Sequence, residues 1–301
     1  MSNFAPEHIL CPVDFSEQSA AALRVAGVVA QSFGSEVVVL HVQRLEAPVY
    51  FTVAQTQALQ GQLRRSVRAA RKLVSEFVHK HLPETVRHRV MVMEDDPVAA
   101  ILKTQQEIGA DLIAMGTHGR GGLARVRLGS IAESVLHQAE VPILTVGPRM
   151  KLTPTLDAIR RVLCPVNYSP SSQTALEHAA AVASSTGAEL IVAHIDEAPL
   201  GKSAQDSLGR LCEWIPATVR AHCAVKEVVK QGSAAEQIVE EAERSQADLL
   251  VIGAQPRSLL GAVLLGSTTE LVIRSASCPV LSVMALSKDS SLSGDQGMRP
   301  L

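Results

Sequence analysis

The sequence is poor in aromatic residues, which make up 3% of its 301 positions. The core must therefore be built from Val, Leu, Ile and Ala, as is usual for parallel sheets covered by helices. The aromatic platforms on which proteins stack single-stranded nucleic acid are scarce as well. An excess of charge is also lacking, since 28 basic residues face 30 acidic ones. This balance predicts neither nucleic acid nor an anionic membrane as a partner.

Long apolar runs and a cysteine framework are missing too. No stretch approaches the roughly 18 apolar residues that a membrane span needs. Residues 1–8 lack the basic region and apolar core of a signal peptide. The five cysteines contain no Cys-x-x-Cys spacing, which is typical of reduced thiols. We therefore expect a cytoplasmic protein.

What the sequence does contain is one unit written twice. Ile9–Asp14 (ILCPVD) returns as Val162–Asn167 (VLCPVN), an offset of 153 (164 − 11). Ala110–Ile113 (ADLI) returns as Ala247–Leu250 (ADLL), an offset of 137 (248 − 111). The second copy is therefore 16 residues shorter (153 − 137) between these matches. We assign two domains, at residues 1–147 and 160–286, joined by a linker at residues 148–159. Residues 287–301 are assigned to a disordered tail.

Strand-like and helix-like stretches alternate within each copy. Apolar residues spaced by three or four positions predict a long helix over 54–81, and Asp95-Asp96-Pro97 is a typical helix start. Five strands joined by helices predict an α/β fold with a doubly wound parallel sheet in each copy. In the first copy we expect strands at about 8–13, 36–42, 86–93, 111–115 and 141–146, and helices at 16–33, 54–81, 97–109 and 130–138.

A glycine-rich loop follows the strand that ends at Met115. Its pattern is Gly116, two residues, Gly119, nine residues, and then Gly129-Ser130 at the start of a helix. Glycines allow backbone N–H groups to approach a ligand closely, and a helix N-terminus favours an anion. Arg120, Arg125 and Arg127 add positive charge. The loop therefore predicts a phosphate site, with an ordinary surface loop as the alternative.

This spacing resembles the nucleotide-binding signature of the universal stress protein family, and the surrounding GTHGRGGLARVRLGSIAESVL resembles the family closely. It is neither a P-loop, which needs Gly-Lys-Ser/Thr, nor a dinucleotide fingerprint. The resemblance implies a strand order of 3-2-1-4-5 in both domains, with the ligand at the point where the order reverses. It also implies that the last strands of the two copies pair antiparallel, as an intramolecular pseudo-dimer, and leaves a homodimer of whole chains open.

By the same resemblance, the ligand is ATP, with Mg²⁺ as a possible companion. Asp14 would accept from ribose hydroxyls or reach the metal, and Arg120 would add charge beside the phosphates. The implied site residues fall into three groups: Pro12, Val13, Asp14 and Val42 for adenine and ribose, Met115, Gly116 and Gly119 for ribose and phosphates, and Gly129, Ser130 and Ile131 for the phosphate chain.

The second copy departs from the pattern. Asn167 replaces the aspartate, Pro256 stands where the signature has its second glycine, and Arg257 is the one arginine left between the glycines. Proline lacks an N–H group and has a fixed φ. Gly266-Ser267 is retained. We expect one nucleotide per chain, in the first copy.

Several other residues suggest structural roles. Cys11 and Cys164 share one repeated strand position, which predicts small core residues. His41 and His194 also recur and are interpreted as structural. His79 and His81 lie two apart on a helix and so point apart, which argues against a metal site. His118 could contact phosphate or be exposed.

The leading hypothesis is a nucleotide-binding regulatory module without a catalytic residue pair, in which slow ATP hydrolysis remains open. One alternative is an interaction scaffold that binds no nucleotide. Another is an enzyme of a related fold, such as a nucleotidyltransferase or an ATP pyrophosphatase. Those enzymes carry His-x-Gly-His or Ser-Gly-Gly-x-Asp-Ser after the first strand, where this chain has Asp14-Phe15-Ser16-Glu17.

Overall fold

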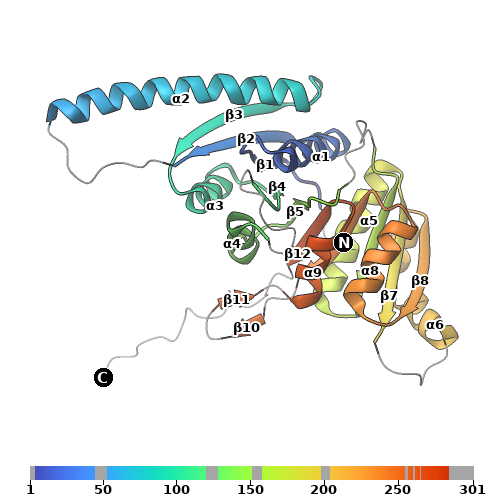
Figure 1. The fold of residues 1–301 in the computed structure, drawn as a ribbon. Helices are drawn as coiled ribbons and strands as arrows, with labels where there is room; N and C mark the ends of the chain where they lie inside the picture. The colour runs from blue at the N-terminus through green and yellow to red at the C-terminus, as the bar shows by residue number, and fades with distance from the viewer. Residues whose placement is uncertain are drawn as a thin grey trace, which may run out of the picture.

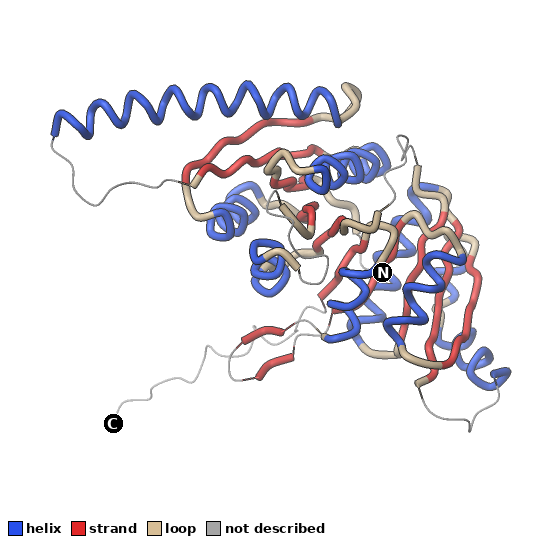
Figure 2. The backbone as a smooth tube through the Cα atoms, viewed as in Figure 1, coloured by secondary structure: helices blue, strands red, loops and turns tan. Residues whose placement is uncertain are grey.

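The computed structural model describes residues 4–44, 53–119, 128–150, 158–197, 204–254, 257–259, 262–264 and 266–284. Its two halves are both α/β units (Figures 1 and 2). They meet along one strand pair and also between their first helices, where the Ser185 hydroxyl donates to the Ser32 carbonyl. The expected tail at 287–301 and most of the expected linker lie outside the described residues.

The first half follows the predicted alternation of strands and helices, and no boundary differs from the predicted one by more than two residues. Its elements are β1 (His8–Pro12), α1 (Glu17–Phe33), β2 (Glu36–Gln43), α2 (Val53–His81), β3 (His88–Glu94), α3 (Pro97–Ile108), β4 (Leu112–Gly116), α4 (Ser130–Gln138) and β5 (Ile143–Val146).

The second half repeats this plan with a shortened second helix. Because of the 16-residue deletion, α6 has 11 residues where α2 has 29. A short hairpin, β10–β11, lies between Gly253 and Gly266, which are the counterparts of Gly116 and Gly129. The elements are β6 (Arg161–Val166), α5 (Pro170–Thr186), β7 (Glu189–Asp196), α6 (Ala204–Trp214), α7 (Ala217–Arg220), β8 (Val225–Gln231), α8 (Ala234–Arg244), β9 (Leu249–Ala254), β10 (Arg257–Leu259), β11 (Ala262–Leu264), α9 (Ser267–Ser275) and β12 (Val280–Met284).

The two halves share one ten-stranded sheet, in the order β3-β2-β1-β4-β5-β12-β9-β6-β7-β8. Each half thus has the expected 3-2-1-4-5 order. The seam is the antiparallel pair β5–β12, in which Leu144 lies opposite Leu281. This pairing confirms the intramolecular pseudo-dimer, and it removes two apolar strand edges that separate domains would expose.

Local signals set the helix ends. Ser16 caps α1 by accepting from the backbone N–H of Ser19, and α1 ends at Gly34, whose φ of 73° suits glycine. Asp96 accepts from the N–H groups of Val98 and Ala99 at the start of α3. The predicted start of α3 at Asp96-Pro97 is therefore confirmed.

The core lies on both faces of the sheet, and neighbouring strand residues enter opposite layers. Ile9 and Cys11 pack into one layer and Leu10 into the other. Each layer contains residues from both halves. Burial raises the pKa of the Cys11 thiol to about 12, and it raises the pKa of Cys164 as well. Both cysteines are thus inert core residues, as predicted.

Among the described helices, none combines the length and the apolar character that a membrane crossing requires.

Candidate functional site

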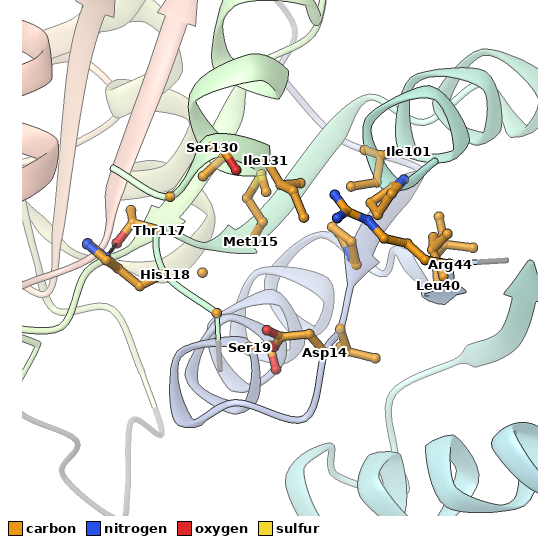
Figure 3. Close-up of a pocket in the computed structure, with 18 residues that line it drawn as sticks. Asp14, Ser19, Leu40, Arg44, Ile101, Met115, Thr117, His118, Ser130 and Ile131 are labelled. Carbon is orange, nitrogen blue, oxygen red and sulfur yellow. Dashed lines mark hydrogen bonds between the residues drawn. The ribbon is translucent and has the colours of Figure 1, made fainter. Parts of the chain in front are cut away.

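A cavity of about 510 Å³ opens where β1, β2 and β4 end and α4 begins (Figure 3). Its volume lies in the range of small-molecule sites. Every predicted site residue that the structure describes lines it; Arg120, like Arg125 and Arg127, lies outside the described residues. The lining residues are Pro12, Val13, Asp14, Ser19, Leu40, Val42, Arg44, Pro97, Ile101, Met115, Gly116, Thr117, His118, Gly119, Gly129, Ser130, Ile131 and Ala132.

Asp14 joins the end of β1 to the start of α1. Its Oδ1 accepts from the backbone N–H of Ser16 at 3.0 Å and from the Ser16 hydroxyl at 2.6 Å. Ser16, and not Asp14, is the N-cap of α1. Asp14 Oδ2 lies towards the loop after β4, since a Cβ atom on Gly119 would be 2.6 Å from it. Two segments about a hundred residues apart in sequence therefore meet at one carboxylate.

The signature glycines are needed by the chain's own packing. A Cβ on Gly116 would lie 2.8 Å from Cβ of Gln18 and 3.0 Å from its carbonyl carbon, and one on Gly129 would lie 2.8 Å from the carbonyl oxygen of Thr117. Gly253, the counterpart of Gly116, would meet the carbonyl carbon and oxygen of Ser171 at 2.5 Å. The glycine at this repeated position therefore lets a strand end approach a helix closely, and its presence alone does not indicate a ligand.

Gly253→Ala should accordingly destabilise the fold, although we expect no nucleotide beside it. The new methyl group would collide with backbone atoms that cannot rotate away, so the free energy of unfolding should fall by about 1–3 kcal/mol. Urea denaturation followed by circular dichroism measures this. Gly209→Ala is the control, because a Cβ there has no atom of the described chain within 4 Å; it lies in helix α6, and alanine should hold or raise stability. An unchanged midpoint for Gly253→Ala would contradict the packing argument.

The start of α4 provides hydrogen-bond donors. Its N-cap is Gly129, which has no side-chain oxygen, and no side chain of the described chain caps the helix. The first N–H groups of a helix need partners and favour an anion. Thr117 and His118 lie beside this end, with Thr117 Oγ1 and His118 Nδ1 2.9 Å apart. Thr117 is buried, and His118 is half-buried and lines the cavity.

The opposite end of the cavity is apolar except for one side chain. Sequence reasoning found Val42 but missed its neighbours on alternate positions of the strand, Leu40 and Arg44. Residues two apart on a strand share a face, so the assignment of Val42 could have found both. Ile101 lies one helical turn after Pro97, and both line the cavity from α3. The remaining lining residues that the motif did not indicate are Ser19, Thr117 and Ala132.

His41 and His194 have the structural role expected of them. His41 Nδ1 lies 2.8 Å from the carbonyl oxygen of Val13, and His194 Nδ1 lies 3.0 Å from that of Val166. Phe15 packs on the His41 ring with centroids 4.7 Å apart. Both histidines thus fix the chain where it leaves the first strand of each half.

The equivalent edge of the second half carries different chemistry. Asn167 keeps the turn, because its Oδ1 accepts from the Ser169 N–H at 3.2 Å. Glu197 occupies the position of Arg44 in the repeat, and its Oε1 accepts from the N–H of Ala234 at the start of α8, 3.1 Å away. Pro256 lies outside the described residues. A carboxylate therefore covers a helix start where the first half presents a guanidinium to its cavity.

Comparisons with known proteins agree with this plan. The family model described as universal stress protein family matches residues 6–147 and 158–283. A universal stress protein of Mycolicibacterium smegmatis is 30% identical over 292 residues, which is 91% of this chain and 96% of that protein. One of Mycobacterium tuberculosis is 28% identical over 237 residues, 72% and 75% of the two chains.

Solved structures share the tandem fold. A universal stress protein from Archaeoglobus fulgidus superposes with a TM-score of 0.70 at 24% identity, over 94% of this chain and 100% of that one. A putative universal stress protein from Pseudomonas aeruginosa gives 0.64 at 20% identity, over 93% and 94%. The two matched segments, the shared sheet and the full-length relatives lead to one conclusion: the chain belongs to the universal stress protein family, as a tandem member with two family domains.

Proposed function

We propose that this stress-response family member is a regulatory module that binds ATP in the cavity of its first half. The observation that supports this best is the convergence of the separately predicted motifs: the end of β1, the end of β2, the glycine signature and the start of α4 all line one cavity of about 510 Å³. Its apolar end suits a purine, and the uncapped start of α4 suits phosphate.

Asp14 would address the ribose or a magnesium ion. It is the one carboxylate among the lining residues of the described chain. Its Oδ1 is held by Ser16, so the side chain has a fixed orientation, and Oδ2 would be the atom to accept from ribose hydroxyls or approach Mg²⁺. The triphosphate, which can reach both the glycine loop and α4, should bind more tightly than AMP.

We propose binding rather than rapid turnover because the described lining residues offer no accessible nucleophile with a base beside it. The hydroxyl of Thr117 and the imidazole of His118 lie within hydrogen-bond distance, but Thr117 has no exposed surface and its hydroxyl also donates to the Val146 carbonyl. A nucleophile must reach its substrate. The rival hypotheses are an enzyme of related fold, which would convert ATP rapidly, and a scaffold, which would not bind it.

Gly119→Pro should weaken ATP binding roughly 10- to 150-fold. The substitution removes an N–H group, worth about 1.5–3 kcal/mol if it donates to phosphate. It also places carbon atoms where a Cβ would lie 2.6 Å from Asp14 Oδ2. Calorimetry with ATP measures the affinity, and chromatography of the same samples measures ADP formation.

The control for this experiment is Gly209→Ala, which lies on α6 in the other half and should leave ATP affinity unchanged. Equal affinity in Gly119→Pro and wild type would refute the assignment of the glycine loop. A wild-type chain without measurable ATP binding would favour the scaffold, and rapid ADP formation would favour the enzyme.

A further inference from the structure

We propose that Arg44 is the outer wall of the base-binding end of the cavity, where its guanidinium stacks on the face of the nucleotide base. This inference rests on the proposed ATP site and adds to it a residue that the glycine signature does not include. Arg44 directly follows β2 and lies two residues after Val42. It enters the cavity from the side opposite Thr117, His118 and Ser130 (Figure 3).

The surroundings of Arg44 favour a flat, apolar ligand group. Its neighbours in this end of the cavity are aliphatic, and among the described lining residues none is Phe, Tyr or Trp, while His118 lies at the opposite end (Figure 3). The guanidinium is therefore the planar π group that this end offers. Arginine stacks on aromatic rings, and base stacking on planar groups does not depend strongly on which base is bound. The aliphatic residues that line the cavity from β2 and α3 are Leu40, Val42, Pro97 and Ile101.

The side chain is available for this contact. Arg44 is exposed at the mouth of the cavity. Within the described part of the chain, no salt bridge or hydrogen bond is recorded for it. An aliphatic wall on the inner face of a base and an exposed guanidinium on its outer face would sandwich the ring.

In the second half, the residue at this position has a partner of a different kind. Glu197, its counterpart, bonds to the N–H of Ala234. The residue that corresponds to Ala234 in the first half is Pro97, which has no N–H to offer, and α3 is capped by Asp96 instead. Arg44 is thus not required by the helix start and can serve the ligand.

Phosphate recognition is assigned elsewhere. The uncapped start of α4 lies across the cavity from Arg44 (Figure 3), and the glycine loop carries three further arginines in its sequence. If Arg44 contacts the base, its removal should weaken the binding of ATP but not of a phosphate chain that lacks the base. If Arg44 contacts phosphate, its removal should weaken the binding of both.

The test combines two substitutions with two ligands. ATP and inorganic tripolyphosphate are titrated into wild type, Arg44→Ala and Arg44→Lys, by calorimetry or by competition. Arg44→Ala should weaken ATP binding roughly 5- to 150-fold, the range for loss of one stacked base, and should leave tripolyphosphate affinity unchanged. Arg44→Lys keeps the charge but not the plane, so it should not restore ATP affinity. Arg68→Ala is the control, because Arg68 is exposed on α2 and does not line the cavity.

Equal losses for both ligands, or full rescue by lysine, would show a charge contact with phosphate and overturn the inference. So would an unchanged ATP affinity in Arg44→Ala. If wild type itself failed to bind ATP, the proposed function would be wrong, and that result is distinct from the three results above.

Discussion

A titration of the full chain with ATP should end at one nucleotide per chain, bound in the first half. The second half keeps its sheet and the Gly266-Ser267 helix start, but it has other residues at three positions that we propose to contact the nucleotide in the first half. Asn167 stands for Asp14, Glu197 for Arg44 and Pro256 for Gly119. If each loss costs about 1 kcal/mol, the sum is about 3 kcal/mol, or more than about 100-fold in affinity. Calorimetry at low micromolar protein and native mass spectrometry both report the stoichiometry.

Two variants sharpen this prediction. Asp14→Asn should weaken the single site. Asn167→Asp should not create a second one, since the second half would still have Glu197 in place of the stacking guanidinium and Pro256 in place of a glycine N–H. Weak binding of a lone phosphate at the start of α9 is compatible with the argument, because that helix also begins after a glycine without a side-chain cap. Two equivalent ATP sites would contradict it.

Leu281→Asp should destabilise the whole chain by more than about 3 kcal/mol. Leu281 is 2% exposed and lies at the seam, opposite Leu144. The substitution removes buried apolar atoms and places an unpaired carboxylate in the core. Because both core layers contain residues of both halves, we expect one unfolding transition in wild type and in the variant. Urea denaturation, followed by circular dichroism and by the fluorescence of Trp214, measures both quantities.

Leu271→Asp is the matched control. It introduces the same side chain in the same half, but Leu271 lies on α9 and is 47% exposed. Its effect should stay within about 0.5 kcal/mol. Two separate transitions in the wild-type chain would show that the halves fold independently and that the seam is not a shared core.

The sequence predicts the fold well because its signals are local and are repeated. Apolar spacing, the helix start at Asp96-Pro97 and the two copies of the motif ILCPV/VLCPV depend on neighbours in the chain. The strand order and the seam came from the family resemblance, and the observed sheet confirms both. The extent of each domain remains a prediction.

The cavity is harder to predict because it depends on which side chains converge in space. Arg44 and Ile101 belong to no sequence motif. They line the same cavity as Gly116 and Gly119 because of where β2 ends and how α3 packs on the sheet. The signature glycines were interpreted as ligand contacts, whereas Gly116 and Gly129 are first required by close contacts with Gln18 and Thr117. A spacing pattern records where glycine is needed without recording whether protein or ligand needs it.

The antiparallel pairing of β5 and β12 makes the strands of the two halves point in opposite directions. Strands within each half are parallel, whereas β5 and β12 run in opposite senses. The carboxyl ends of the strands in one half therefore lie at the end of the sheet opposite to those of the other half. The end of the first half holds the cavity with Asp14 and Arg44, and the end of the second half carries Asn167 and Glu197. The fused chain therefore presents two chemically different ends, which face in opposite directions along the strands.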